Sequence, residues 1–379
     1  MFWRKERIYL DYAAGVGGNP SSPHKEGRDA KKTLEDARTV IARLIEVQSD
    51  DVIFTSGATE SNALAILGHV RARRLVMPEG VPGRNTMHVL YLPSAHASIV
   101  ENTKLLAQEG IIVEPLPIKD YRVDTEALAK MLRSETILVS MDAVCGETGV
   151  VWNTREVAHI VSKHPSSILL HVDASQAPLT EKMTRAHFGA DMLTLDASKV
   201  GTTRGIGVLV AHRTIPMNPL YKGGGQERGL RSGSESPELA RSFAEALSVA
   251  ALGREVFRAS AEKDRKILIE NITKSVPNVY IQEGRVQAPQ ILNLSLPGRD
   301  TDYVVALLDE AGFAISSRSA CETDSEDGSR AVFTLTNDFE RARSTLRISW
   351  GPDIRSSELA RFAKALSRAV AFVDSSSQG

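Results

Sequence analysis

The 379-residue chain lacks what several classes of protein require. Its two cysteines, Cys145 and Cys321, are too few for a disulfide framework and indicate a reducing compartment such as the cytoplasm. Aromatic residues make up 5% of the chain, which argues against stacking platforms for single-stranded nucleic acid. No apolar run approaches the roughly 18 residues of a membrane helix, and the N-terminus lacks the apolar segment of a secretory signal.

Neither sign of charge is in excess. The 46 Lys and Arg residues face 47 Asp and Glu residues, for a formal net charge of −1, so there is no broad positive field for nucleic acid or an anionic membrane. Hydrophobic residues at 42% and charged residues at 25% are typical of a globular chain. We therefore expect a cytoplasmic protein of two or at most three domains that binds neither nucleic acid nor membrane.

Short apolar runs alternate with helical patterns over the first two thirds of the chain. The spacing of apolar residues predicts an amphipathic helix over 21–47. Strands are predicted over 52–55, 89–92, 111–115, 137–140, 168–172, 192–195 and 207–210, and helices over 59–74, 97–109, 125–134 and 154–163. This alternation indicates an α/β fold with a mainly parallel seven-stranded sheet covered by helices. Ligands of such sheets bind in the turns that follow the carboxyl ends of the strands.

The last third of the chain indicates a smaller α+β unit. A long helix is predicted over 237–272, followed by strands over 289–296, 313–316 and 345–350 and by helices over 301–310 and 356–373. The segment 322–330 is polar and acidic, which predicts a mobile loop, and 374–379 is expected to fray. Placing the boundary inside the long helix gives a large domain over 15–250 and a small α+β domain over 1–14 and 251–379.

The turn after the first predicted strand is rich in small residues. Gly57 and Ala58 allow close approach of the backbone to a ligand, and the free N–H groups at the start of the next helix favour an anion. Thr59 adds a hydroxyl group. The same pattern is also typical of an ordinary helix cap, so by itself it is a weak indication of function.

An acid and a lysine follow two later strands. Asp173 directly follows one predicted strand, and Lys199 lies in the turn after the next, so both should face one crevice. A lysine in that position can form a Schiff base, and a carboxylate can pair with a pyridinium nitrogen. An ordinary salt bridge at the strand ends is the alternative explanation.

The motifs together resemble those of the cysteine desulfurases of the class V aminotransferase family, which are fold type I pyridoxal-phosphate enzymes. The most specific pieces are GGGQERGLRSGSE at 223–235 and the ordered pair of ISSRSAC at 315–321 and STLRISWG at 344–351. Individually weaker pieces occur in the same order, among them IYLDYAA (8–14), GNPSSPHKEG (18–27), FTSGATESN (54–62), HVDASQA (171–177) and DASK (196–199). The resemblance spans nearly the whole chain.

The resemblance implies a role for each matching residue around pyridoxal 5'-phosphate, the cofactor of the large domain. Lys199 would hold the cofactor as an imine and move the Cα proton of the substrate, while Asp173 would keep the pyridine nitrogen protonated. Gln176 would bond the phenolic oxygen, and His96 would stack on the ring and assist proton transfer. The phosphate ligands would be Ala58, Thr59 and Ser198, together with Ser234 from the second subunit of a homodimer.

For the substrate, the resemblance implies L-cysteine. Arg347 would bind its carboxylate through a bidentate guanidinium. Cys321, on the predicted loop of the small domain, would attack the sulfur atom, leaving L-alanine and an enzyme persulfide whose sulfur passes to an acceptor or iron–sulfur scaffold protein. A small buried residue at a strand end is the structural alternative for Cys321. Cys145 matches no family role and is interpreted as structural.

Five departures from the family pattern stand near the implied site. An asparagine is replaced by Gly146, a histidine by Ser198, a small hydroxyl residue by Asp196 and a glycine by Arg318, and about twenty residues are missing between LDYAA and GNPSS. The charge of Asp196 should repel the phosphate if its side chain points inward. Two alternatives therefore stay open. The chain could be another class V pyridoxal-phosphate enzyme (an aminotransferase, selenocysteine lyase or β-lyase), or a degenerate binding subunit without activity.

Overall fold

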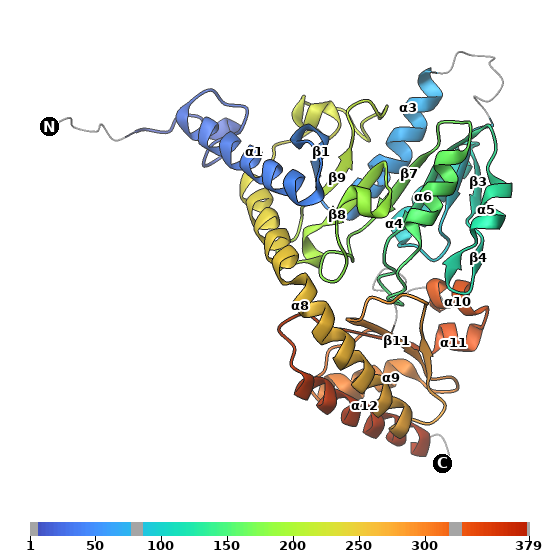
Figure 1. The fold of residues 1–379 in the computed structure, drawn as a ribbon. Helices are drawn as coiled ribbons and strands as arrows, with labels where there is room; N and C mark the ends of the chain where they lie inside the picture. The colour runs from blue at the N-terminus through green and yellow to red at the C-terminus, as the bar shows by residue number, and fades with distance from the viewer. Residues whose placement is uncertain (1–6, 77–85, 318–327, 377–379) are drawn as a thin grey trace.

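A computed structural model describes residues 7–76, 86–317 and 328–376. Its centre is a seven-stranded sheet in the order β1-β9-β8-β7-β6-β2-β3 (Figure 1). The strands are β1 (Val52–Thr55), β2 (His88–Tyr91), β3 (Ile112–Pro115), β6 (Thr136–Asp142), β7 (Leu169–Asp173), β8 (Met192–Asp196) and β9 (Gly207–Ala211). Only β9 runs antiparallel to its neighbours within this sheet. The prediction of a mainly parallel seven-stranded sheet is confirmed.

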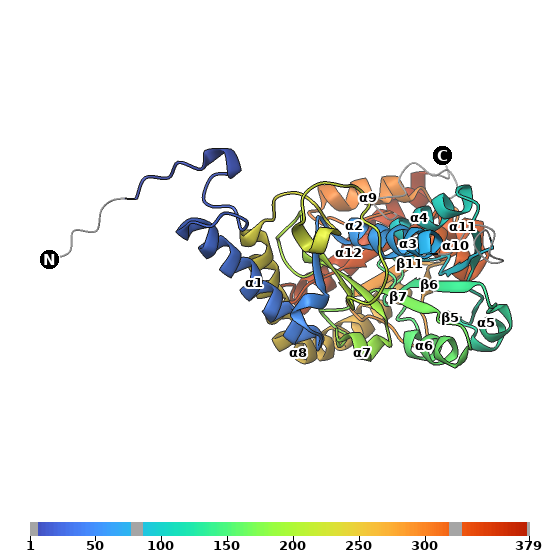
Figure 2. The ribbon, with the colours of Figure 1, turned by 90° about the horizontal axis from the view of Figure 1, so that it is seen from above.

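Helices cover both faces of this sheet. Seen from above, α2 to α4 lie on one side and α6 and α7 on the other (Figure 2). The helices are α1 (Lys25–Ile45), α2 (Ala58–Ala63), α3 (His69–Val76), α4 (Ala97–Gln108), α5 (Thr125–Met131), α6 (Thr154–Lys163) and α7 (Arg185–Phe188). Because both faces are covered, all seven residues of β6 and all five of β9 are buried, which explains their continuous apolar runs.

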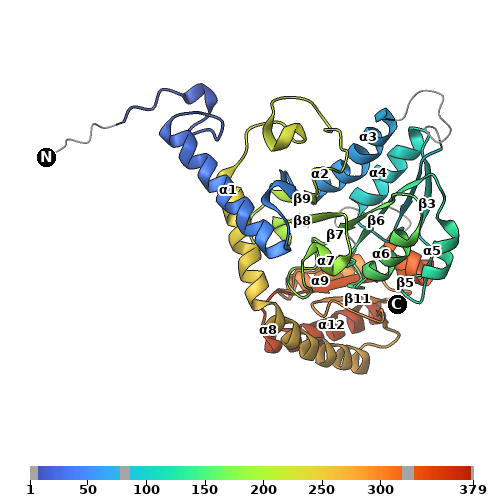
Figure 3. The same cartoon turned by 45° about the horizontal axis from the view of Figure 1, so that its top comes forward.

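The C-terminal part packs around a second, three-stranded antiparallel sheet in the order β10-β11-β12. Its elements are β10 (Tyr280–Gln282), β11 (Ile291–Ser295), β12 (Thr345–Ser349), α9 (Thr301–Glu310), α10 (Arg330–Thr336), α11 (Phe339–Arg343) and α12 (Ser356–Ser376). The 39-residue α8 (Pro237–Ser275) connects it to the large sheet (Figure 3). Apolar residues form two buried clusters, and α8 contributes Phe243 to the first and Leu268 to the second. The exact domain boundary stays a prediction.

Two of the predicted elements are wrong. The run 313–316 is not a strand, because only Ser316 pairs with β12, through a single bridge to Arg347. The tail does not fray at 374: α12 continues to Ser376, and Asp374 accepts hydrogen bonds from Arg299 at 2.7 and 3.0 Å, which hold this last turn. Residues 322–327 of the predicted loop lie outside the described residues, and α10 begins at Arg330.

Residues 7–14, expected with the small domain, contact the start of α1 instead. Arg7 pairs with Glu26, with 2.7 Å between Nε and Oε1, and Asp11 lies 2.9 Å from the ring of His24, which caps α1. Figure 1 shows this segment at the other end of the molecule from α12. Among the described helices, none is both long and apolar enough to cross a membrane.

Candidate active site

A cavity of about 140 Å³ lies at the carboxyl ends of the central strands. Four residues to which the resemblance gives a role line it: Lys199, His96, Gln176 and Arg347. The other lining residues are Ser94, Ala95, Ala97, Asp142, Cys145, Gly146, Glu147, Arg330 and Ala331. The large sheet therefore supplies the lysine, histidine and glutamine, and the C-terminal sheet supplies Arg347.

Asp173 is the last residue of β7 and is buried. Its Oδ2 accepts a 2.6 Å hydrogen bond from Asn62 Nδ2, and its Oδ1 accepts one of 2.9 Å from the backbone N–H of Ser175. Two residues earlier, His171 lies between the hydroxyl groups of Ser140 and Thr194, at 2.8 and 3.1 Å. Burial lowers the pKa of His171 to about 4, so its ring is neutral at pH 7. The hydrogen bonds from Asn62 and Ser175 fix the Asp173 carboxylate in one orientation.

The same network reaches His96. The second hydrogen of Asn62 Nδ2 bonds Ser98 Oγ at 2.8 Å, and Ser98 Oγ lies 2.8 Å from His96 Nδ1. His96 also caps α4, because its Nδ1 accepts from the backbone N–H of Ser98. A continuous chain of hydrogen bonds therefore joins His96 to Asp173 through Ser98 and Asn62 and orients the imidazole ring.

A second carboxyl group, that of Asp142, lines the cavity, whereas Asp173 itself is not among the lining residues. Asp142 ends β6, and its Cα is the register partner of the Asp173 Cα on β7. Its Oδ1 is buried without a hydrogen-bond partner among the described residues. Burial, and then the charge of Asp173, raise the pKa of Asp142 to about 8, although Arg330 lowers it in part. Sequence reasoning missed this residue; the signal was an acid ending a buried strand.

Lys199 follows β8 in a 3₁₀ turn, Ala197–Lys199, and is exposed at the cavity. Asp196, the last residue of β8, points into the turn that the sequence assigned to the phosphate. Its Oδ1 accepts from the N–H and the hydroxyl of Ser198, at 2.8 and 2.6 Å. Its Oδ2 accepts from the N–H of Ala58, at 2.7 Å. The inward orientation that would repel a phosphate is therefore present.

Arg347 reaches the cavity from β12. Its Nη1 lies 3.3 Å from the carbonyl oxygen of Gly146, and its Nη2 lies 3.3 Å from Ser316 Oγ. Gly146 makes room for a neighbour, because a Cβ atom there would lie 3.0 Å from Gln176 Nε2. The glycine that replaces the family's asparagine at position 146 therefore leaves space that the side-chain amide of Gln176 occupies.

Other predicted residues lie elsewhere. Ser234 is exposed and lines a separate cavity of about 560 Å³ with residues 14–20. Thr59 is exposed, and Cys321 and Arg318 lie outside the described residues. Cys145 is buried in the wall of the Lys199 cavity, and burial raises the pKa of its thiol to about 12, so the thiol stays protonated at pH 7.

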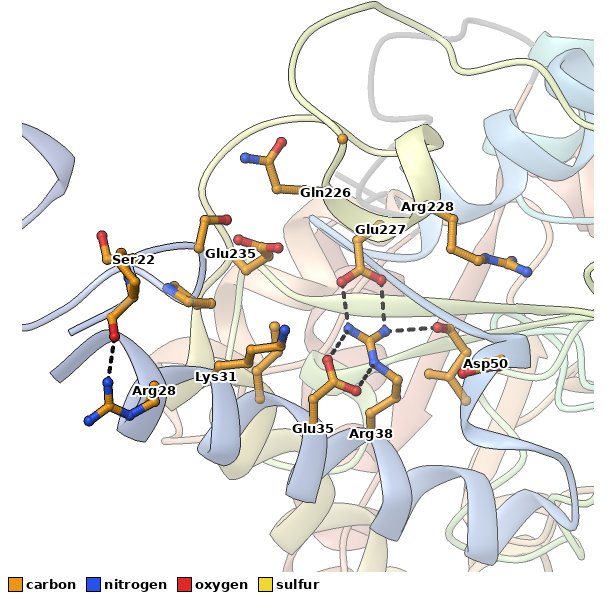
Figure 4. Close-up of a pocket in the computed structure, with 16 residues that line it drawn as sticks. Ser22, Arg28, Lys31, Glu35, Arg38, Asp50, Gln226, Glu227, Arg228 and Glu235 are labelled. Atoms are coloured by element: carbon orange, nitrogen blue, oxygen red, sulfur yellow. Dashed lines mark hydrogen bonds and ion pairs between the residues drawn. The ribbon is translucent and has the colours of Figure 1, made fainter. Parts of the chain in front are cut away.

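A larger cavity of about 720 Å³ lies between α1 and the glycine-rich loop at 223–233 (Figure 4). Three of its charged groups are engaged in a structural network. Arg38 forms a buried bidentate pair with Glu227, at 2.7 and 2.8 Å, and also bonds Glu35. Glu227 in addition accepts from the N–H of Phe54 at 2.8 Å. This pair anchors the loop to α1 and β1, so we assign the cavity no chemistry.

No group of three or more His, Cys, Asp or Glu side chains within the described ranges is arranged to hold a metal ion.

Comparison with known proteins identifies relatives over nearly the whole chain. The family described as aminotransferase class V matches residues 6–362. The chain is 32% identical to the cysteine desulfurase IscS 1 of Archaeoglobus fulgidus, over 90% of this chain and 87% of that relative. It is also 32% identical to the mitosomal cysteine desulfurase of Trachipleistophora hominis, over 95% and 81%.

Solved structures give the same result. A structure named as a NifS-like protein superposes with a TM-score of 0.84 at 27% identity, covering 94% of this chain and 92% of the other. SspA in complex with cysteine superposes with a TM-score of 0.73 at 27% identity, covering 88% and 91%. The fold and the order of the motifs are thus similar to those of proteins that carry these names.

Proposed function

Because the chain belongs to the class V aminotransferase family, we propose that it is a pyridoxal-phosphate-dependent cysteine desulfurase. It converts L-cysteine to L-alanine and transfers the sulfur to an enzyme thiol. The observation that carries the proposal is the meeting of Lys199, His96, Gln176 and Arg347 around one cavity, with His96 bonded through to Asp173. Relatives that carry the name cysteine desulfurase support it.

The chemistry of the donor set fits the ring of pyridoxal phosphate. Lys199 supplies a primary amine for the aldehyde. The carboxylate of the buried Asp173, which two donors hold in place, can accept a hydrogen bond from the protonated pyridine nitrogen. The Gln176 amide can donate to the phenolic oxygen, and the imidazole of His96, which Ser98 orients, can lie against the ring. When bound, the cofactor accepts electrons from the Cα of the substrate.

Arg347 is the residue that binds the substrate carboxylate. Both of its present hydrogen bonds are 3.3 Å long, so a carboxylate can replace them with shorter charge-assisted bonds. Its planar fork fixes the orientation of the amino acid and brings the Cα toward Lys199. The Lys199 amine then takes the Cα proton at Nζ and returns it at the end of the reaction.

The sulfur step uses the thiol of Cys321. Its thiolate attacks the substrate sulfur, the C–S bond breaks, and the carbon fragment leaves as L-alanine after protonation. L-Cysteine and the thiol thus give L-alanine and a persulfide, so no external oxidant or reductant is needed. The persulfide sulfur is then transferred to an acceptor protein for iron–sulfur cluster or thio-cofactor synthesis. The low number of cysteines supports a reducing compartment such as the cytoplasm.

A homodimer completes the proposal. Ser234 is exposed and lines a cavity other than that of Lys199, so it is available to a partner subunit. The apolar residues Ile8, Leu10, Tyr12 and Val16, of which Val16 lines the same cavity, are also exposed, at 68% or more, which favours their burial against a second copy.

The test is product analysis with purified protein and L-cysteine in the presence of a thiol reductant. We expect equal amounts of L-alanine and sulfide, and we expect Cys321→Ser to form neither. Cys145→Ser is the matched control and should keep most of the activity, because its thiol is buried and protonated. Keto-acid products would identify an aminotransferase instead, and activity that survives in Cys321→Ser would refute the role of this thiol.

A further inference from the structure

The turn that should receive the phosphate of the cofactor already holds a carboxylate of the chain. We propose that Asp196 occupies this anion position, so that the site binds the aldehyde and ring of its cofactor with little selectivity for the phosphate group. This inference rests on the proposed function. It makes Asp196 the residue that sets cofactor specificity.

The contacts of Asp196 bridge the two segments that the sequence assigned to the phosphate. One carboxylate oxygen accepts a hydrogen bond from the Ala58 N–H at 2.7 Å. The other accepts hydrogen bonds from the N–H and the hydroxyl of Ser198, at 2.8 and 2.6 Å. The Asp196 carboxylate also lies close to the backbone of Gly57, since a Cβ atom on Gly57 would lie 3.2 Å from Asp196 Oδ2. Three donors of suitable chemistry for an anion are thus satisfied from within the chain.

Two further N–H groups of this turn are also engaged. The N–H of Ser56 donates to Glu60 at 2.5 Å, and that of Gly57 donates to Thr55 Oγ1 at 3.3 Å. Glu60 is itself held by the hydroxyl of Tyr221 at 2.7 Å and by Arg231 at 3.4 Å. A phosphate entering this turn would therefore meet two carboxylates and would have to displace Asp196 to gain the donors of Ala58 and Ser198.

The side chains of the ring end make no hydrogen bond to Asp196, although Asp196 caps the turn Ala197–Lys199 that carries Lys199. Asp173 bonds Asn62 and Ser175, and Lys199 lines the cavity. None of the hydrogen bonds of Asp196 involves these two side chains. Pyridoxal, which lacks the phosphate, can therefore use the ring end in full while Asp196 stays in place.

The experiment compares pyridoxal 5'-phosphate with pyridoxal. Purified protein freed of cofactor is titrated with each, and the dissociation constants are measured by equilibrium dialysis and by the absorbance change at Lys199. We expect the two constants of the wild type to differ by less than about 10-fold. Asp196→Ser removes the charge and frees the donors, so it should tighten phosphate-ester binding about 10-fold or more without tightening pyridoxal.

Asp191→Ser is the matched control, because Asp191 precedes the other end of β8 and accepts from the Leu170 N–H. It should leave the ratio of the two constants unchanged. A wild type that prefers the phosphate ester by more than about 1000-fold, with no tightening in Asp196→Ser, overturns the inference. If Asp196→Ser does not fold, inorganic phosphate is tested on the wild type, where a raised melting temperature contradicts the inference and an unchanged one supports it.

Failure of the proposed function gives a different result. Borohydride reduction followed by peptide mass analysis shows whether either aldehyde reacts with Lys199. If neither does, the pyridoxal chemistry itself is refuted. If both do to similar extents, the proposed chemistry and the role of Asp196 stand together.

Discussion

The two ends of the candidate site differ in what the chain itself has placed there. At the ring end, Asp173 is fixed by neutral donors and Lys199 stands at a cavity. At the anion end, the donors of Ala58 and Ser198 are satisfied by Asp196. The Lys199 end therefore opens onto a cavity, whereas the Asp196 end forms a closed set of hydrogen bonds within the chain.

The largest effect is expected from removing the amine at the ring end. Lys199→Ala should abolish covalent capture of either aldehyde, because the described cavity contains no second lysine. Borohydride reduction and mass analysis measure this directly, and Lys222→Ala, an exposed lysine, is the control. Capture that persists in Lys199→Ala would mean that attachment does not belong to the ring end.

A smaller but still large effect is expected at the acid. Asp173→Asn keeps the shape but removes the charge and one of the two oxygen acceptors, so we expect kcat to fall on the order of 100-fold. Melting temperature should also fall, because the amide has a single oxygen and leaves either the Asn62 or the Ser175 donor facing its NH2 group. If kcat stayed within a factor of three, the electrostatic role of the ring end would be wrong.

Substrate binding should respond more modestly. Arg347→Lys keeps the charge but loses the planar fork, which predicts a KM for L-cysteine raised about 10- to 100-fold. Binding of pyridoxal should be unaffected, since Arg347 belongs to β12 and contacts Gly146 and Ser316. A loss of pyridoxal binding in this variant would show that the ring end extends to the C-terminal sheet.

The smallest effect concerns the pH dependence of stability. The folded chain keeps the proton of Asp142 up to about pH 8, whereas the unfolded chain releases it near pH 4. Between these values the folded state binds more protons, so this group lowers the free energy of unfolding as pH rises. The free energy of unfolding of Asp142→Asn should therefore be higher relative to the wild type at pH 8.5 than at pH 5.

Urea unfolding at the two pH values measures this difference. Asp309→Asn, on the exposed face of α9, is the control and should show no such dependence. Equal stabilisation of Asp142→Asn at both pH values would contradict a neutral carboxyl group in the folded protein.

The sequence was sufficient for the large sheet because its central strands are buried on both faces and their apolar runs are unbroken. It failed where elements are short. β10 has three residues, and α11 has five, which is too few for a period to appear. The run 313–316 has the composition of a strand, but only Ser316 pairs with β12.

For the site, the positions of Asp173 and Lys199 at strand ends were predictable from the alternation of strands and helices. The direction of the Asp196 side chain was not, because it depends on the turn at Ala58, which is 138 residues away. Asp142 was missed for a similar reason. Its perturbed ionisation arises from burial and from Asp173 on the neighbouring strand, and neither is visible along the chain.

The long α8 has a consequence for how the protein comes apart. At about 1.5 Å per residue its 39 residues extend some 58 Å, and they bury Phe243 in one apolar cluster and Leu268 in the other. Melting either cluster frees one half of a continuous helix and weakens the support of the other half. We therefore expect calorimetry to record one cooperative heat-absorption peak, in which the Lys199 wall and the Arg347 wall of the cavity are lost together.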